Sequence, residues 1–342
     1  MQPTGDFPLV RKLALTGEKT LKVSKIELAR VRRALTGILA VSLLGILLPR
    51  PADAADWKTL AAPPVPIYLA ATETINGVIY VAGGQSGSGP ASTLQAFNPE
   101  TKTWTLLASM PLTLYQGNGA GVINSQLYVA GGWNGPLPTT ELLMYDPPSN
   151  TWTTLAAMPH YSACGGTGVI NSKLYVTTAC NGYNGYSSLL DVYDPVADAW
   201  TSLPNSSSAH GSPAFGVIND NFYVAGGTNS SGGVTDVVEV YNPATSTWTT
   251  LAPMPTAVQF ATSVALNGEL YVIGGNNGTN YVANVQVYDP HKNKWKTLAS
   301  LPSAIGFSGG AVAYGLVFME GGYSGAGSDA TNQYMAVAPS IP

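Results

Sequence analysis

Aromatic and amide side chains, which suit the binding of uncharged sugars, gather in short segments that recur along the chain. Two sets stand out, the first being Trp133, Asn134, Tyr183, Tyr186, Asn276, Tyr281 and Tyr323, and the second Tyr115, Gln116, His160, Tyr161, His210, Gln259 and Phe260. Aromatic rings pack on the C–H faces of a sugar, and amides exchange hydrogen bonds with its hydroxyl groups. These residues are the candidate ligand-binding residues, although tight loops without any function also favour Asn, Gly and Ser.

Groups that could transfer protons or hold a metal are few. Glu73 and Glu320 are the two carboxylic acids that stand near predicted inner strands, and each is a candidate acid or base or a structural carboxylate. His160 and His210 stand at equivalent places in neighbouring repeats, but two histidines without a third ligand leave a metal site incomplete. We therefore expect no metal and no cofactor, and the sequence favours a non-catalytic protein while leaving an enzyme as the alternative.

The N-terminal region has the pattern of an export leader. A charged n-region, residues 1–33, precedes an apolar h-region, residues 34–48, which is short for a membrane span of about 20 residues. Ala52-Asp53-Ala54 supplies the small residues that a signal peptidase recognises, which predicts cleavage after residue 54. Residues 55–342 are thus expected outside the cytoplasm, in the periplasm, secreted or at the cell surface, with membrane contact only through an uncleaved leader.

The charge of residues 55–342 limits the class of partner. All five Arg lie in the leader, and the remainder has six Lys against fifteen Asp and Glu, a net charge of −9. Nucleic acid would be repelled, because its binding depends on Lys and Arg at the phosphates. We expect a monomer that binds a neutral glycan or a protein partner.

A repeat of 47 or 48 residues runs through the region after the leader. Trp residues mark it at 57, 104, 152, 200, 248 and 295. Glycine doublets recur in phase, and Thr178-Ala179 replaces the doublet of the third repeat. A run such as Leu127-Tyr128-Val129 precedes each doublet, and an aromatic with an Asx-Pro turn, such as Tyr145-Asp146-Pro147, follows most of them. Each repeat therefore predicts four short strands.

Four-stranded repeats that stack radially and close into a ring bury both faces of each sheet. We predict an all-β, six-bladed propeller over residues 55–342, in which the N-terminal strand at Trp57 to Leu60 completes the last blade beside Gln333 to Ala338. In this topology the loop that leads into each innermost strand, the incoming loop, and the loop after each doublet emerge on one face. We call this face the mouth. The candidate ligand-binding residues lie there, together with Tyr68 and Phe307 of the incoming loops, and Trp133 is the one Trp after the leader outside the periodic series.

Cys164 and Cys180 are expected in the first and second strands of the third repeat, on either side of a turn at Asn171-Ser172. Pairing of Ile170 with Lys173 places Cys164 opposite residue 179, which is close enough for a disulfide. Export brings the chain into an oxidising compartment. A Cys164–Cys180 disulfide is the prediction, and two buried thiols are the alternative.

The spacing of apolar run, glycine doublet, Tyr and Trp resembles the kelch repeat over roughly residues 56–338. The resemblance implies a propeller used as a non-catalytic binding or interaction module. A weaker similarity to bacterial N-acetylneuraminate epimerases implies an alternative, a sugar epimerase or mutarotase that uses the same mouth. Sialic acids carry a carboxylate that Arg usually holds, so the lack of Arg after the leader favours a neutral sugar. A copper radical oxidase similar to galactose oxidase is disfavoured by six repeats instead of seven.

Overall fold

The computed structural model describes residues 57–115, 119–180 and 185–325. The chain divides into two compact units, Met1–Leu48 and Pro49–Pro342, and all described residues belong to the second. This described part consists of strands, turns and loops and includes no helix that could cross a membrane. The predicted leader, residues 1–54, lies outside the described residues.

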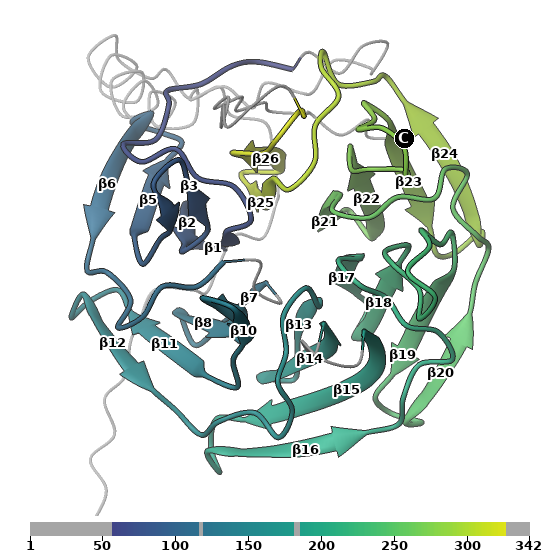
Figure 1. Ribbon diagram of the computed structural model, residues 1–342, viewed down its shortest axis with the longest axis horizontal. Helices are drawn as coiled ribbons and strands as arrows, with labels where there is room; N and C mark the ends of the chain where they lie inside the picture. Colours follow the sequence, from purple (N-terminus) through teal and green to yellow (C-terminus); the bar gives the residue numbers. More distant parts are fainter. Residues whose placement is uncertain (1–56, 116–118, 181–184, 326–342) are drawn as a thin grey trace, which may run out of the picture. The chain divides into compact units, whose positions relative to one another are not determined.

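Five four-stranded antiparallel sheets, blades 1 to 5, follow one another around a central axis (Figure 1). Within each blade the chain runs from the innermost strand outwards. The strands are β1 (Ala71–Ile75), β2 (Val78–Ala82), β5 (Leu94–Asn98) and β6 (Thr103–Leu107) in blade 1; β7 (Ala120–Ile123), β8 (Gln126–Ala130), β11 (Leu142–Asp146) and β12 (Thr151–Thr154) in blade 2; β13 (Thr167–Ile170), β14 (Lys173–Cys180), β15 (Tyr186–Asp194) and β16 (Ala199–Leu203) in blade 3; β17 (Ala214–Ile218), β18 (Asn221–Ala225), β19 (Val238–Asn242) and β20 (Thr247–Thr250) in blade 4; β21 (Thr262–Leu266), β22 (Glu269–Ile273), β23 (Val285–Asp289) and β24 (Lys294–Leu298) in blade 5.

Tight two-residue turns set the register of the inner strand pairs. In Asn76-Gly77, between β1 and β2, both residues have positive φ, 50° and 81°, as a turn matched to the twist of a hairpin requires. Nearly all residues of the second strand of each blade are buried, since this strand has sheet on both edges and a neighbouring blade on each face. Its apolar run, predicted from the sequence, therefore forms the core between blades.

The number of complete blades differs from the prediction of six. After blade 5 the chain forms a two-stranded sheet, β25 (Gly309–Ala313) and β26 (Leu316–Glu320), so the described residues make five four-stranded blades and one partial sheet. The innermost strands nevertheless pack in a closed cycle, β1, β7, β13, β17, β21, β25 and back to β1 (Figure 1). The β25–β26 sheet therefore takes the sixth place in the ring.

The predicted closing strand is also not seen. Residues 57–60 form no strand, although Trp57 packs against the cluster that contains Val317 and Met319 of β26. An outermost strand needs a third strand for its backbone hydrogen bonds, and the expected one, residues 333–338, lies outside the described residues.

The periodic Trp residues lie at the rim and are not fully buried as a core series would be. Trp152 is half-buried, stacks on Tyr145 with ring centroids 5.1 Å apart, and donates its indole N–H to the Ala108 carbonyl oxygen at 2.8 Å. Asn150 accepts hydrogen bonds from the Tyr145 hydroxyl group and the Ala108 amide. The same Tyr, Asx and Trp arrangement recurs in blades 3 and 5 and fastens each blade to the preceding linker.

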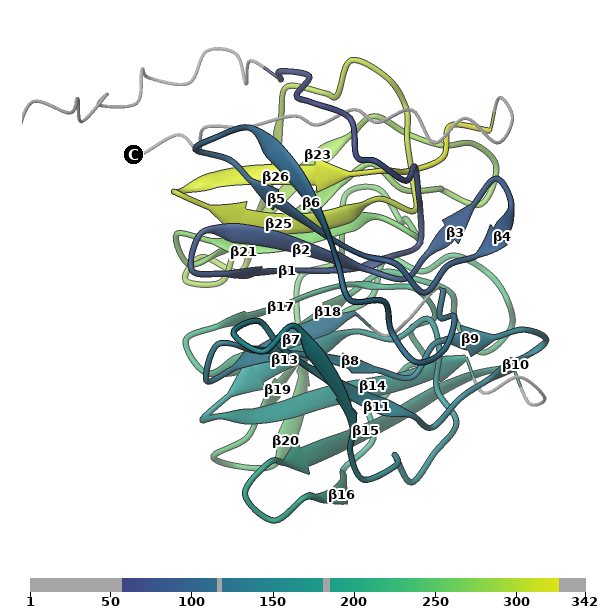
Figure 2. The same cartoon turned by 90° about the vertical axis from the view of Figure 1, so that its left-hand side faces the viewer.

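Short hairpins mark the mouth. β3 (Gln85–Ser86) pairs with β4 (Gly89–Pro90), and β9 (Trp133–Asn134) pairs with β10 (Leu137–Pro138). In Figure 2 both hairpins project on the same side of the ring, opposite the turn between β1 and β2. The loops after the doublets thus share one face, as the repeat predicts.

Candidate functional site

Each incoming loop at the mouth pairs with the segment after a glycine doublet. The bridged pairs are Tyr68 with Gln85, Tyr115 with Trp133, Ala163 with Cys180, Gly211 with Thr228, Gln259 with Asn276, and Gly306 with Tyr323. Backbone hydrogen bonds run in both directions, for example at 2.9 and 2.8 Å between Gln259 and Asn276. The candidate side chains are therefore held at equivalent positions around the axis.

A ring of strained backbone lies directly inside these pairs. The next residue of each described incoming loop is left-handed, with φ between 52° and 60°, and these residues are Leu69, Cys164, Ser212, Phe260 and Phe307. We call them the belt. Hydrogen bonds from amide to carbonyl oxygen link Leu69 to Phe307, Phe307 to Phe260, Phe260 to Ser212, and Ser212 to Cys164. A non-glycine residue in this conformation costs roughly 1–2 kcal/mol, so the inter-blade bonds must hold it.

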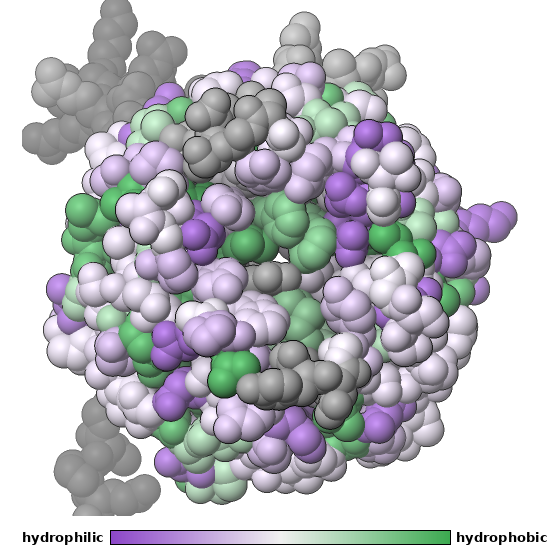
Figure 3. Space-filling view, in the orientation of Figure 1, coloured by the Kyte–Doolittle hydropathy of each residue, from purple (hydrophilic) through white to green (hydrophobic). Residues whose placement is uncertain are grey.

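The belt borders a central cavity of about 520 Å³. Most of the remaining wall comes from the innermost strands of the ring, which contribute mainly small residues and also Thr72, Thr74, Thr167, Thr262 and Ser263. In Figure 3 the face is hollowed at its centre, with hydrophobic and hydrophilic residues around the hollow. The size lies in the range of pockets for small organic ligands.

Glu73 of β1 is the one charged residue among the described residues that line this cavity. Burial raises the pKa of Glu73 to about 7, and a hydrogen bond from the Thr74 amide, at 3.2 Å, opposes the rise. A carboxyl group that titrates near neutral pH in a cavity is a candidate acid, base or ligand-binding group. The other predicted carboxyl, Glu320, ends β26, is 2% exposed, and does not line the cavity.

Five aromatic side chains meet on one side of the mouth and form what we call the aromatic cluster: Tyr68, Phe260, Tyr281, Phe307 and Tyr323. Phe307 is central, with ring centroids 4.2 Å from Phe260 and 6.0 Å from Tyr281. Phe260 and Phe307 also line the cavity. The structure thus joins three predicted residues, Phe260, Tyr281 and Tyr323, with Tyr68 and Phe307 from the same set of loops.

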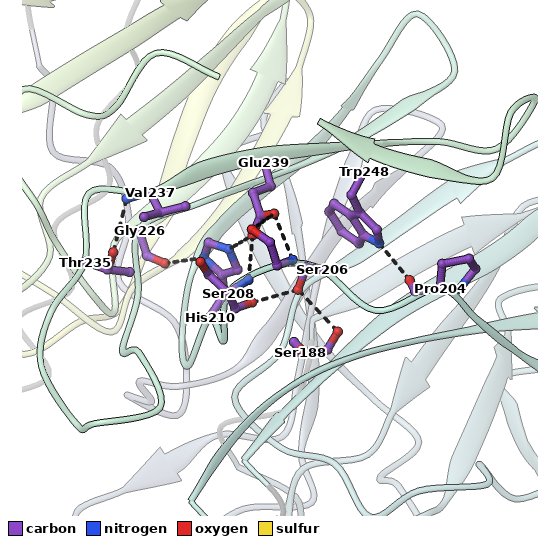
Figure 4. A network of polar contacts seen from close by, with 11 residues as sticks. Ser188, Pro204, Ser206, Ser208, His210, Gly226, Thr235, Val237, Glu239 and Trp248 are labelled. Carbon is purple, nitrogen blue, oxygen red and sulfur yellow. Dashed lines mark hydrogen bonds and ion pairs between the residues drawn. The ribbon is translucent and has the colours of Figure 1, made fainter. Parts of the chain in front are cut away.

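His210 is a buried structural group and not an open part of the mouth. Its Nδ1 lies 2.8 Å from the Gly226 carbonyl oxygen and its Nε2 lies 2.9 Å from Glu239 Oε2, and only 3% of the side chain is exposed (Figure 4). Burial alone would raise the pKa of Glu239, but hydrogen bonds from His210 and Ser207 outweigh it and lower the pKa. Both ring nitrogens of His210 therefore have an oxygen partner within the blade.

Glu239 also accepts hydrogen bonds from the backbone amides of Ser207 and Ser208, so the pair anchors the incoming loop of blade 4. His160 is similar in kind, with Nδ1 2.9 Å from the buried Asp191. Among the described residues no group of three or more His, Cys, Asp or Glu is arranged to hold a metal ion.

The predicted disulfide joins Cys164 and Cys180, whose Cα atoms lie 5.5 Å apart. Cys180 ends β14 as expected, but Cys164 lies in the incoming loop before β13 and not in the first strand. The predicted register holds nevertheless, because Thr167 pairs with Val176 and Ala163 with Cys180. The disulfide therefore stands in the belt.

The other predicted residues lie apart from the aromatic cluster or outside the described residues. Trp133 and Tyr186 pack against the disulfide. Asn134 and Tyr161 are exposed, the Tyr115 hydroxyl group donates to the Gly135 carbonyl oxygen, and the Gln259 side chain accepts from Thr228. Asn276 accepts from the Gly278 amide. Gln116 and Tyr183 are not among the described residues.

Sequence reasoning missed the belt and the buried acids Asp191 and Glu239. Both acids stand two residues before the periodic Tyr, where blades 1 and 5 have Gln95 and Gln286. A polar residue at this buried position in four repeats was the available signal. Gln95 and Gln286 exchange hydrogen bonds with the backbone of Val65 and Thr256 in their own incoming loops.

The ring of antiparallel blades and the mouth over a central cavity define a propeller of the kelch type. The kelch motif matches residues 66–111, and the family described as Attractin/LZTR1 beta-propeller matches residues 117–331. The chain belongs to this Attractin/LZTR1 β-propeller family.

Among solved structures the chain is similar to one titled "Structure of YjhT". The TM-score is 0.69 and the sequence identity 19%, and the match covers 82% of this chain and 95% of that one. No curated protein matches the chain. At this identity the structural likeness shows a shared fold.

Proposed function

We propose that the protein is an exported, non-catalytic binding module whose mouth binds a neutral glycan. The aromatic cluster carries this proposal, because it brings five rings together beside a cavity whose lining has a single charged residue. An acidic ligand would meet the carboxyl group of Glu73 and no basic side chain in the cavity wall. The alternative ligand of this module is a protein partner that inserts a polar loop into the mouth.

The aromatic cluster can be tested with a panel of neutral mono- and oligosaccharides. Tyr281→Ala removes a ring that contacts Phe307 and Tyr323, and we expect it to weaken sugar binding at least about tenfold in calorimetric titration. Tyr314→Ala is the matched control, since Tyr314 is an exposed tyrosine in the β25–β26 turn, at the end of the blades away from the mouth. Equal affinities of both variants and the wild type would contradict the proposal.

Ring closure and export belong to the same proposal. The sixth place of β25–β26 in the ring and the packing of Trp57 on this sheet support a sixth blade completed by residues 333–338 and by the chain around Trp57 to Leu60. The disulfide supports an extracytoplasmic location, and the pattern of residues 1–54 supports a cleaved leader.

A sugar epimerase or mutarotase is the second candidate, and one observation favours it. Glu73, with a pKa of about 7, could give and take protons at neutral pH. NMR exchange between the anomers of any sugar that binds, compared in wild type and Glu73→Gln, tests this activity. An identical exchange rate in both proteins excludes Glu73 as the acid or base.

A further inference from the structure

Glu73 departs from the repeat at a position where the ring has little space. The residues that pair with the central aromatic of the second strand are Glu73, Gly121, Gly168, Gly216, Val264 and Ala311. A Cβ atom added to Gly168 would stand 2.6 Å from Val217, and one added to Gly121 would stand 2.8 Å from Val169. Packing therefore favours a small or apolar residue here, and blade 1 instead has a glutamate. Such departures from a local rule are expected at functional sites.

The surroundings of Glu73 leave its charge unbalanced. Its one hydrogen bond among the described residues comes from the Thr74 amide, and the buried hydroxyl oxygens of Thr72 and Thr74 have no partner there. The strands packed against β1 are β2, β7, β8 and β25, whose titratable residues are Tyr80 and Tyr128. Burial raises the pKa of both tyrosines, so both are neutral at pH 7. The next carboxyl group, Glu320 on β26, pairs with Gly309 of β25 and supplies no cation.

The aromatic cluster suits a cation as well as a sugar. Phe260 and Phe307 line the cavity and also belong to the cluster. Ring faces within about 6 Å attract an ammonium group. A ligand that reaches from the mouth into the cavity would thus meet π faces first and then a carboxyl group with free acceptor capacity.

We propose that the ligand class is an amino sugar, whose ring stacks on the aromatic cluster and whose primary ammonium group binds Glu73 in the cavity. The inference rests on the proposed function for the sugar and adds a cation site that the neutral glycan does not use. An N-acetylated sugar lacks the charge and would not gain from this site.

A matched pair of probes isolates the charge. The 2-aminoethyl and 2-hydroxyethyl glucosides differ in one terminal group, and the alkylammonium, like that of Lys, stays charged well above neutral pH. We expect the aminoethyl glucoside to bind the wild type about tenfold more tightly than the hydroxyethyl glucoside, since bonds to charged groups are stronger than neutral ones. This advantage should grow from about pH 6 to pH 8 as Glu73 ionises.

In Glu73→Gln the advantage and its pH dependence should disappear, while the hydroxyethyl glucoside keeps its affinity. Glu100→Gln removes an exposed carboxyl group of the same blade and should behave as the wild type. Equal binding of both glucosides by the wild type overturns the ammonium site and leaves the proposed function intact. If neither glucoside binds but ethanolamine binds the wild type and not Glu73→Gln, the proposed function fails and the ammonium site stands. No binding of any probe overturns both.

Discussion

The ring has two dissimilar halves at the mouth. In blades 3 and 4 the belt holds a disulfide, and two His–carboxylate pairs, His160 with Asp191 and His210 with Glu239, lie between the incoming loop and the third strand. From blade 5 through the sixth sheet to blade 1 the belt residues are Phe260, Phe307 and Leu69, and Gln286 and Gln95 replace the His–carboxylate pairs. The same repeat thus has a disulfide and His–carboxylate anchors in one half and a cluster of aromatic rings in the other.

The longer second strand of blade 3 explains why this blade has no glycine doublet. In the other half, Gly274 and Gly275 have φ of 66° and 98°, and the chain leaves the strand there. In blade 3 the second strand continues through Thr178 and Ala179 to Cys180, with a bulge between Thr178 and Cys180. An extended strand needs no positive φ, so glycine is not required. The disulfide then fixes the end of this longer strand.

The largest difference in stability between the halves is expected from the residues that anchor the incoming loops, Glu239 in blade 4 and Gln286 in blade 5. Glu239→Ala leaves the His210 imidazole buried without its carboxylate and should lower the free energy of unfolding by about 4 kcal/mol. Gln286→Ala removes only neutral hydrogen bonds and should cost about 1–2 kcal/mol. Urea unfolding of both variants measures the difference, and equal losses would contradict an ionic anchor.

Low pH should remove the stability that the Glu239 anchor contributes. The pKa of Glu239 is lowered on folding, so its stabilisation is complete above the unfolded value of about 4.3 and is lost as the pH falls through the folded value. Glu239→Gln should lack this acid-dependent loss, whereas Gln286→Ala should keep it.

Substitutions in the glycine doublet of blade 5 and in Thr178-Ala179 of blade 3 should differ in their cost in stability, by a smaller amount. A Cβ atom on Gly274 would overlap the Ile305 carbonyl oxygen of the next incoming loop, and φ is 66°. Gly274→Ala should therefore cost about 3 kcal/mol from strain and overlap together. Ala179→Gly in blade 3 should cost under about 1 kcal/mol, because the strand there is extended. Similar melting temperatures of the two variants would show that blade 3 does not follow a different backbone path.

These halves were only partly predictable from the sequence. The two-residue turn at Asn171-Ser172 predicted the strand register, and the register predicted the disulfide, because the two strands are neighbours in the sequence. The aromatic cluster joins Tyr68 to Tyr323 across the seam of the ring, which no local pattern encodes. The sequence indicated only a loop position for His210, because its partner Glu239 lies 29 residues later and becomes a neighbour only in the folded blade.

Removal of the disulfide should lower the free energy of unfolding by somewhat less than Gly274→Ala does. Cys164 and Cys180 enclose a short loop, and the Cys164→Ala/Cys180→Ala variant should lose about 2–3 kcal/mol. Reduction of the wild type should give a similar loss, while reduction of the double variant changes nothing. If sugar binding at the aromatic cluster is unchanged in the folded double variant, the two halves act independently. A large loss of affinity would show that the belt couples them.

Ionisation of Glu73 should have the smallest effect on the free energy of unfolding, and its pH dependence should be opposite to that of Glu239. Folding raises its pKa to about 7, so burial of the neutral acid is tolerated at low pH and the folded state loses stability as the pH rises from the unfolded value through about 7. Because Glu73 is partly exposed to the cavity, we expect a loss of about 1–2 kcal/mol between pH 5 and pH 8, and none from this source in Glu73→Gln. The variant should therefore be more stable than the wild type at pH 8, since a residue kept for binding is retained at a cost in stability. A Glu73→Gln protein that is less stable than the wild type at pH 8 would instead assign Glu73 a structural role in closing blade 1 against blade 2.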